Sequence, residues 1–213
     1  MTVRPQIRTA VVCAAVLVAS AAVASAQPVV VARLAVKERA TFRYLQFFQQ
    51  RGDWVLPDIG YIDYGDAAYH ELFAGFGRML RKSPHLNVLG ELYYLQAGGS
   101  ASAGEKYLLP WVLVAFSASS RIRGEAVYFP YLPLTDAGTL QHVVERAKLE
   151  YTWPHFKVGG GYGAYQRHGG DWQHMPFATV TVSPPVVGDL EFWAQRVHQG
   201  GVQVQFRYFR VFK

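Results

Sequence analysis

Apolar and polar residues alternate strictly near the end of the chain, in the segment Val202-Gln203-Val204-Gln205-Phe206-Arg207-Tyr208. A period of two residues predicts a β-strand with two unlike faces. Similar segments recur upstream, and ten candidate strands can be placed from residue 41 onward. Their ranges are 41–50, 69–80, 86–96, 107–118, 122–131, 142–152, 156–165, 177–183, 189–197 and 202–212. Most have close to the ~9–11 residues that a tilted membrane strand needs.

Long and short connections alternate between these segments. The long ones are 51–68, 97–106, 132–141 and 166–176, followed by a tight turn at 198–201; the short ones are 81–85, 119–121, 153–155 and 184–188. Such alternation is typical of outer-membrane β-barrels, in which the short turns face the periplasm. The segments 29–36 and 59–65 are candidates for two further strands, and merging weak segments lowers the count.

After residue 26 the chain has no apolar stretch near the roughly 20 residues that a membrane-spanning helix needs. Aromatic residues nevertheless make up 15% of the sequence. A closed barrel reconciles these two facts, because only every second residue of its strands faces lipid. We therefore predict an all-β fold, a closed antiparallel up-and-down transmembrane β-barrel of about 10 strands, with about 8 or 12 as alternatives.

The first 26 residues are predicted to be a cleaved secretory signal peptide. Arg4 and Arg8 form a positive start, residues 10–23 are apolar, and Ala24-Ser25-Ala26 is a small-x-small cleavage site. Residues 27–40 then form a periplasmic lead-in or the start of the first strand, and residues 41–213 form the barrel. Export and a barrel fold together predict a location in the bacterial outer membrane. Because Cys13 is the only cysteine, no disulfide or thiolate site is expected after cleavage.

The clearest strands separate lipid-facing residues from residues that face the lumen. Segment 142–152 alternates charged with apolar side chains, and hydrocarbon excludes charge, so the charged face is expected to point into the barrel. The residues predicted to line the lumen are Glu71, Glu91, Arg123, Glu125, Arg146, Lys148, Glu150, Lys157, Glu191 and Arg207. The residues predicted to face lipid are Leu149, Tyr151, Trp153, Val204, Phe206 and Tyr208.

The predicted lumen residues comprise five acids and five bases. Buried charges persist when they are paired or hydrated, so this balance predicts side chains that pair with one another and largely fill the interior. Segments 41–50 and 107–118 do not divide into a polar and an apolar face. A strand that is apolar on both faces is also typical of a soluble sandwich core.

Candidate catalytic and metal-binding residues are sparse. His168, Asp171 and His174 share one connection, but Gly169-Gly170 lies within it and nothing fixes its shape, so no metal site is predicted. The serines of residues 117–120 lie by a tight turn with no histidine nearby in sequence to activate them. We therefore predict no catalytic residues and no cofactor.

The net charge does not indicate a nucleic-acid partner. It is +6 and falls to +4 when Arg4 and Arg8 are removed, which is modest for a chain of this size. The expected partner is outer-membrane lipid, and an envelope protein at the loops or the periplasmic rim is a further candidate. Basic residues gather at this rim, where solvation is the favoured explanation. They are Arg78, Arg81, Lys82, Arg121, Arg123, Lys157, Arg210 and Lys213.

The chain resembles bacterial outer-membrane β-barrel proteins as a broad class, over residues 41–213. The resemblance rests on the signal ending Ala24-Ser25-Ala26, the alternating strands and the aromatic-rich last strand at 202–212. Barrels of this class usually end on an aromatic residue, whereas here Phe212 is penultimate and Lys213 is last. The resemblance to so broad a class carries over no catalytic or binding residues.

The sequence favours a non-enzymatic outer-membrane barrel with a polar, largely filled interior, acting as a structural or binding component. One alternative is a narrow channel for small polar solutes, and another is an outer-membrane lipid-modifying hydrolase. A third is a secreted soluble barrel that binds an apolar ligand. In that barrel the faces are inverted, with Leu149 and Phe206 lining a cavity and Lys148 in water.

Overall fold

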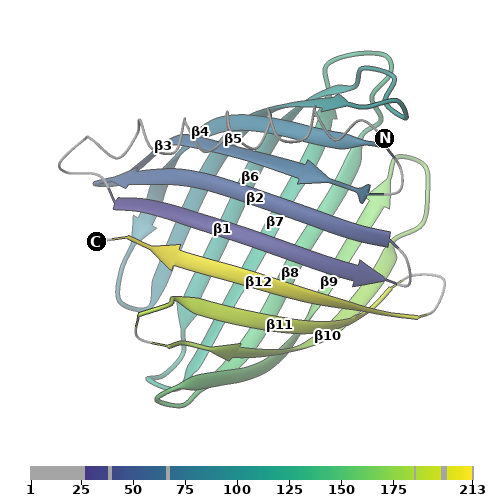
Figure 1. Ribbon diagram of the computed structural model, residues 1–213. Helices are drawn as coiled ribbons and strands as arrows, with labels where there is room; N and C mark the ends of the chain where they lie inside the picture. Colours follow the sequence, from purple (N-terminus) through teal and green to yellow (C-terminus); the bar gives the residue numbers. More distant parts are fainter. Residues whose placement is uncertain (1–26, 38–39, 66–67, 185, 198–200, 213) are drawn as a thin grey trace.

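The computed structural model describes residues 27–212 except 38–39, 66–67, 185 and 198–200. The predicted signal peptide and the last residue, Lys213, lie outside the described residues. Within these described residues, twelve β-strands form one closed sheet, whose course can be followed in Figure 1. The strands are β1 Gln27–Lys37, β2 Ala40–Arg51, β3 Trp54–Asp63, β4 His70–Lys82, β5 Leu86–Gly98, β6 Lys106–Ser117, β7 Ile122–Pro133, β8 Gln141–Thr152, β9 Phe156–Arg167, β10 Gln173–Val182, β11 Asp189–Arg196 and β12 Val202–Val211.

Each strand pairs antiparallel with its neighbours in sequence, and β1 closes the barrel by pairing with β12, from Val29↔Val211 to Val36↔Val204. Closure leaves no edge strand, so the backbone groups of every strand have partners on both sides. The predicted closed antiparallel barrel is confirmed, and within the described residues it has twelve strands, the higher of the two alternatives to about ten. The even number places the start of β1 and the end of β12 at the same end of the barrel (Figure 1).

The ten candidate segments omit two strands. Residues 27–40 contain β1, and the expected long connection 51–68 contains β3. β3 includes Pro57 and Gly60, residues that normally interrupt a strand pattern. Gly60 is paired with Phe73 of β4, and a Cβ atom on Gly60 would lie 2.0 Å from the Phe73 ring. The glycine therefore marks the close approach of an aromatic ring, not a turn.

The connections at one end of the barrel are mostly shorter than those at the other end. At the end that holds the start of β1, here called the proximal end, they are residues 52–53, 83–85, 118–121, 153–155 and 183–188. At the opposite, distal end they include residues 64–69, 99–105, 134–140, 168–172 and 197–201. The prediction of one long connection at 51–68 is wrong, because a tight turn at 52–53 precedes β3. Gly52 makes this turn with a φ of 62°, which glycine adopts without steric cost.

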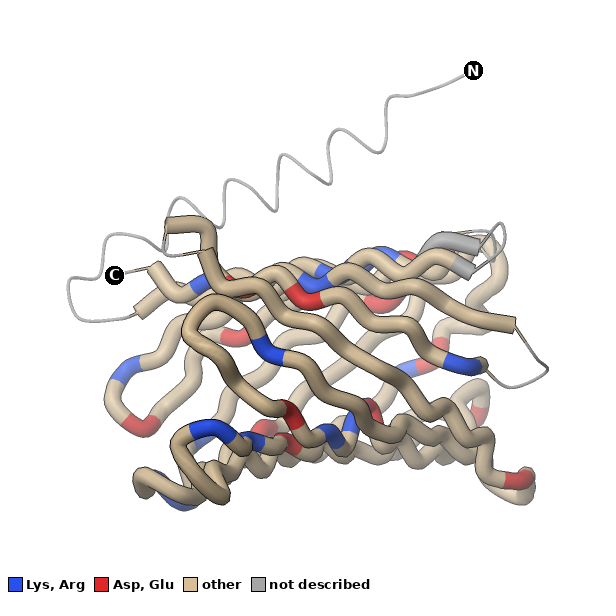
Figure 2. Tube along the Cα trace, turned by 90° about the horizontal axis from the view of Figure 1, so that it is seen from below, with Lys and Arg blue, Asp and Glu red and all other residues tan. Residues whose placement is uncertain are grey.

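The outer surface of the barrel is apolar. Leu149 and Val204 are 56% and 55% exposed. Other exposed apolar side chains on the strands include Leu34, Leu72, Phe76, Val112, Val180 and Phe192. Charged residues also occur in the middle of the strands, not only at their ends (Figure 2). On β8 the charged Lys148 and Glu150 are buried while Leu149 between them is exposed, which is the reverse of what a soluble barrel with an apolar cavity requires.

Among the residues that the structure describes, no helix is long and apolar enough to cross a membrane.

Candidate functional site

Two neighbouring cavities inside the barrel are lined by residues of the described part of the chain. The larger has a volume of about 570 Å³ and reaches Tyr64 at the distal end. The smaller has a volume of about 240 Å³ and reaches Lys157 and Asp189 near the proximal end. We call them the distal and the proximal chamber. The residues that line both are Leu113, Arg146, Arg207 and Phe209. The two chambers therefore share one wall inside the barrel.

Four cations and four carboxylates form a connected network of ion pairs around the shared wall. They are Arg33, Arg146, Lys148 and Arg207 with Glu125, Glu145, Glu150 and Glu191. Lys148 Nζ contacts Glu191 and lies 3.3 Å from carboxylate oxygens of both Glu125 and Glu150. Arg207 joins the network 3.4 Å from Glu191. Each of these charges has a partner of opposite sign, which offsets the several kcal/mol that an isolated buried ion costs.

A β-bulge in β8 adds one carboxylate to this network. Val144 pairs with Ala164 and Ala147 pairs with Tyr162, so two residues of β8 lie opposite the single residue Gly163. The extra residue breaks the alternation of side chains along the strand. As a result the consecutive residues Glu145 and Arg146 both line the distal chamber, where they form an ion pair with each other.

A second polar region is formed mainly by β3, β4 and β5, in the first half of the chain. The Glu71 carboxylate accepts three hydrogen bonds of 3.3 Å from tyrosine hydroxyls. The donors are Tyr64, Tyr69 and Tyr131. Burial, together with the charge of Glu71, raises the pKa of Tyr64 and Tyr69 above its ordinary value, and both lie in the β3–β4 connection. These hydroxyls therefore stay protonated and remain donors.

Two further acids complete this region. Asp58 accepts hydrogen bonds from Gln46 Nε2 at 2.8 and 2.9 Å and from the Tyr93 hydroxyl at 2.9 Å. Glu91 is buried and has Asp58 and Tyr93 as neighbours. Within the described part of the chain, Asp58, Glu71 and Glu91 form no ion pair with a cation within 4.0 Å. We call these three acids and their tyrosine and glutamine partners the acid–tyrosine wall.

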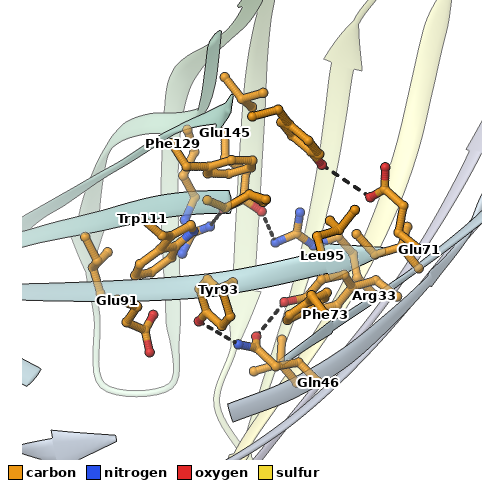
Figure 3. Close-up of a pocket in the computed structure, with 18 of the residues that line it drawn as sticks. Arg33, Gln46, Glu71, Phe73, Glu91, Tyr93, Leu95, Trp111, Phe129 and Glu145 are labelled. Carbon is orange, nitrogen blue, oxygen red and sulfur yellow. Dashed lines mark hydrogen bonds and ion pairs between the residues drawn. The ribbon is translucent and has the colours of Figure 1, made fainter. Parts of the chain in front are cut away.

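Aromatic rings form much of the remaining surface of the distal chamber (Figure 3). They include Phe42, Tyr44, Phe73, Tyr93, Trp111 and Phe129. Phe73 and Tyr93 pack edge to face with ring centroids 5.3 Å apart. The inward faces of β2 and β6 contribute several of these apolar groups, which explains why segments 41–50 and 107–118 do not divide into a polar and an apolar face.

Most residues predicted to line the lumen are found at the chambers. Glu71 and Glu91 line the distal chamber. Those that line the proximal chamber are Glu125, Arg146, Lys148, Glu150, Lys157, Glu191 and Arg207. Lys157 forms an ion pair of 3.0 Å with Asp189. Arg123 lies near the start of β7, is exposed and lines neither chamber, because the strand has reached the proximal rim.

The residues predicted to face lipid alternate with these inward residues. Leu149 and Val204 are highly exposed, and Trp153 is exposed just beyond the end of β8. Phe206 packs against the exposed Phe192 at 5.2 Å. Two tyrosines of the same predicted set, Tyr151 and Tyr208, are partly buried and flank inward residues.

Sequence reasoning missed Arg33, Asp58 and Glu145. Arg33 lies in the segment expected to be a lead-in, and Asp58 lies in the segment expected to be a loop. Glu145 is displaced by the bulge, which strict alternation cannot show. The sequence feature that came nearest to indicating Arg33 and Asp58 was the pair of further strand candidates at 29–36 and 59–65.

The other candidate chemistries find little support in the geometry. Among the described residues, no group of three or more His, Cys, Asp or Glu side chains is placed to hold a metal ion. His174 instead contacts the Tyr162 hydroxyl. Ser119 Oγ accepts hydrogen bonds from the backbone N–H groups of Arg121 and Ile122, at 3.2 and 3.0 Å, so it stabilises the β6–β7 turn.

Solved structures of porins share this fold. A KdgM porin structure aligns with a TM-score of 0.59 at 9% identity, over 87% of this chain and 98% of that one. A structure of "KdgM porin in complex with disordered oligogalacturonate" gives 0.61 at 8% identity, over 87% and 98%. A NanC porin structure gives 0.60 at 10% identity, over 87% and 99%.

No protein-family model matches the sequence, and the search of curated proteins gave no match. At such low identity the likeness to the porins is one of fold alone. The resemblance to outer-membrane β-barrel proteins that the sequence indicates is confirmed at that level, and the similar structures are those of porins.

Proposed function

We propose that this protein is a narrow channel of the bacterial outer membrane that passes small polar solutes. The observation that carries the proposal is the pair of chambers, one reaching each end of the barrel, which meet at Leu113, Arg146, Arg207 and Phe209. The apolar outer surface and the charged interior support a lipid surrounding and a polar passage. The fold shared with KdgM and NanC porins adds support.

The size of the chambers limits the solute. A volume of about 570 Å³ lies within the roughly 300–1,000 Å³ of small-molecule sites, so the distal chamber fits a small molecule. Arg146 and Arg207 stand at the shared wall and are held by ion pairs with Glu125. The place where the two chambers meet is therefore charged, and ion pairs hold its arginines in position. Oligogalacturonate, the acidic oligosaccharide bound by one KdgM structure, sets a precedent for polar solutes in this fold.

A second candidate function is that of a structural or binding component with a closed lumen. The network of four cations and four carboxylates favours it, because interlocked side chains fill space between the strands. The two candidates differ in one measurable property, since only the channel carries a steady ionic current.

Conductance across planar lipid bilayers tests the proposal. Purified wild-type protein is expected to give small, steady single-channel currents. The double variant Leu113→Ala/Phe209→Ala removes side-chain volume from the shared wall without changing its charge. Its conductance is expected to be about twofold higher, because a wider cross-section passes more ions. Leu149→Ala is the matched control on the outer face and leaves the current unchanged.

Absence of current from both the wild type and the widened variant contradicts the channel and favours the closed lumen. Equal conductance in the wild type and in Leu113→Ala/Phe209→Ala places the narrowest point elsewhere. Heat-modifiable migration on gels confirms that each variant is folded before its current is measured.

A further inference from the structure

The proximal end of the barrel carries a large excess of positive charge outside the chambers. Among the residues whose side chains the structure describes, the basic ones there that form no ion pair within 4.0 Å are Arg51, Arg78, Arg81, Lys82, Arg121, Arg123 and Arg210. Asp53 is the only acid in this described part of the proximal end that has no ion pair, because Asp189 is paired with Lys157. Solvation alone is not the only use that such an excess can have.

The distal end shows no such excess. On its described connections and strand ends, Arg43 is paired with Asp63. The charged side chains that remain there, histidines aside, are Lys106, Arg167 and Arg196 against Glu105, Asp136 and Asp171. The positive charge is therefore a property of one rim and not of the whole barrel surface.

Three arginines of the proximal rim lie over aromatic rings. Measured from the guanidinium carbon to the ring centroid, the pairs are Arg78 with Trp54 at 5.3 Å, Arg121 with Tyr151 at 6.0 Å and Arg210 with Phe212 at 4.7 Å. Aromatic rings near the ends of membrane strands lie at the depth of the lipid headgroups. A cation–π contact holds each guanidinium beside its ring, and so at that same depth.

The most complete of these places lies on β2, β3 and β4. Trp54 pairs directly with Arg51 of β2 and with Arg78 of β4, so the three side chains are neighbours on one face of the sheet. This is the outer face, because Trp54 is 49% exposed whereas Val55, the next residue of β3, is buried. Neighbouring strands lie about 4.8 Å apart, so the backbones of the two arginines are separated by about 10 Å. Two long side chains can close that gap around one phosphate group.

We propose that the proximal rim binds the phosphate groups of anionic phospholipids, and that Arg51, Trp54 and Arg78 form its strongest site. A guanidinium group offers a phosphate two parallel N–H donors, and basic side chains near an anionic lipid surface strengthen the attraction. A lipid fits better than an acidic protein, because these arginines project from the outer wall of the barrel, where acyl chains lie, and not from the tips of the turns. The interaction needs the membrane but no current, so it is independent of whether the lumen conducts.

Native mass spectrometry of the protein in a neutral detergent tests the site, with phosphatidylglycerol as the anionic probe and phosphatidylcholine as the zwitterionic one. The wild type is expected to bind phosphatidylglycerol about tenfold more tightly than phosphatidylcholine, and Arg51→Gln/Arg78→Gln is expected to lose that preference. Trp54→Leu is expected to weaken phosphatidylglycerol binding roughly threefold, the size of one exposed cation–π contact. Asp53→Asn is expected to strengthen it about twofold, because it removes the one unpaired carboxylate of the described rim.

The matched control is Lys106→Gln/Arg196→Gln, which removes the same charge from strand ends at the distal end and is expected to keep the preference. Heat-modifiable migration on gels confirms that each variant is folded. Should Arg51→Gln/Arg78→Gln not fold, Arg78→Gln alone carries the same prediction with a smaller loss. Equal binding of the two lipids by the wild type, or equal losses in the rim and control variants, overturns the site. Soluble oligoglutamate that binds the wild type more tightly than phosphatidylglycerol does would assign the rim to an acidic protein and also overturn the proposal.

Discussion

The lumen of this barrel has two unlike walls, and each satisfies buried charge in a different way. Around β8, every cation of the network pairs with at least one carboxylate, and Lys148 alone contacts three of them. On β3 to β5, carboxylates accept hydrogen bonds from neutral donors such as Tyr131 and Gln46 instead. An ion pair supplies a counter-charge to a buried carboxylate, whereas a neutral donor supplies only a hydrogen bond.

This difference predicts that the two walls contribute unequally to stability. The network braces strands that are distant in sequence, because it joins Arg33 of β1 to Glu145 of β8 and Lys148 to Glu191 of β11. The acid–tyrosine wall instead holds its acids by hydrogen bonds to neutral tyrosine and glutamine side chains. Substitutions in the first wall should therefore change stability more than substitutions in the second.

Removal of Lys148 tests the brace with the largest expected effect. Lys148→Met leaves Glu125, Glu150 and Glu191 without their shared cation, and we expect a loss of about 3–5 kcal/mol in the free energy of unfolding. Urea titration of the protein in lipid vesicles measures it. In Lys148→Met/Glu191→Gln one uncompensated charge is also removed, so part of the loss should be recovered. An unchanged urea midpoint for Lys148→Met would show that the network does not brace the barrel.

The same substitution in both walls sharpens the comparison. Glu191→Gln deprives Lys148 and Arg207 of a carboxylate and is expected to cost about 2–3 kcal/mol of stability. Glu71→Gln loses no cation, and its amide oxygen still accepts from tyrosine hydroxyls, so about 1 kcal/mol or less is expected. Parallel urea titrations compare them. Equal losses at the two positions would mean that the two walls do not differ as described.

Glycines that face aromatic rings occur beside both walls, as Gly60 with Phe73 and Gly161 with Phe177. A Cβ atom on Gly161 would lie 2.6 Å from the Phe177 ring, so Gly161→Val is expected to destabilise the barrel by about 1–3 kcal/mol through overpacking. Gly160→Val is the control, because a Cβ there has only the Phe177 carbonyl oxygen nearby, at 3.2 Å. Thermal unfolding followed by circular dichroism ranks the two, and a greater loss for Gly160→Val contradicts the packing described.

An isolated ion pair gives the smallest expected effect. Arg43 and Asp63 lie 3.3 Å apart, and the Arg43 side chain is 62% exposed. Arg43→Gln should change the free energy of unfolding by about 0.5 kcal/mol or less, as is usual for exposed pairs. The same urea titration measures the loss of unfolding free energy. If that loss approaches the value for Lys148→Met, then neither burial nor membership of a network determines how much an ion pair stabilises the barrel.

Alternation, together with the predicted export signal, the alternating connection lengths and the lack of a long apolar stretch, was sufficient to predict the closed barrel, because a membrane strand must keep its apolar face outward along its whole length. The two faces follow the alternation most clearly on β10, on β12 and on the part of β8 after its bulge, where small or apolar outward residues alternate with polar inward ones. Twelve strands remained an alternative to about ten because β3 carries Pro57 and Gly60, and the place of Gly60 in the strand depends on Phe73 of the neighbouring strand.

The candidate site was predictable only in part, because some of its residues are placed by the pairing of neighbouring strands. Glu125, Arg146, Lys148, Glu191 and Arg207 follow the alternation, so their meeting at one wall could be expected from the charge balance. Glu145 could not be assigned, because a bulge is a property of paired strands and leaves no mark in one segment. The distal chamber was also hidden, since its aromatic wall makes β2 and β6 apolar on both faces.

The central claim is a continuous polar passage through the wall shared by the two chambers, and cysteine accessibility tests it most directly. Cys13 is the only native cysteine in the chain, so Leu113→Cys introduces a thiol at the shared wall with little background. A charged methanethiosulfonate reagent is expected to reduce the current of Leu113→Cys and to leave that of Leu149→Cys, on the outer face, unchanged. A current in Leu113→Cys that the reagent does not alter, or an equal block of Leu149→Cys, would contradict the passage.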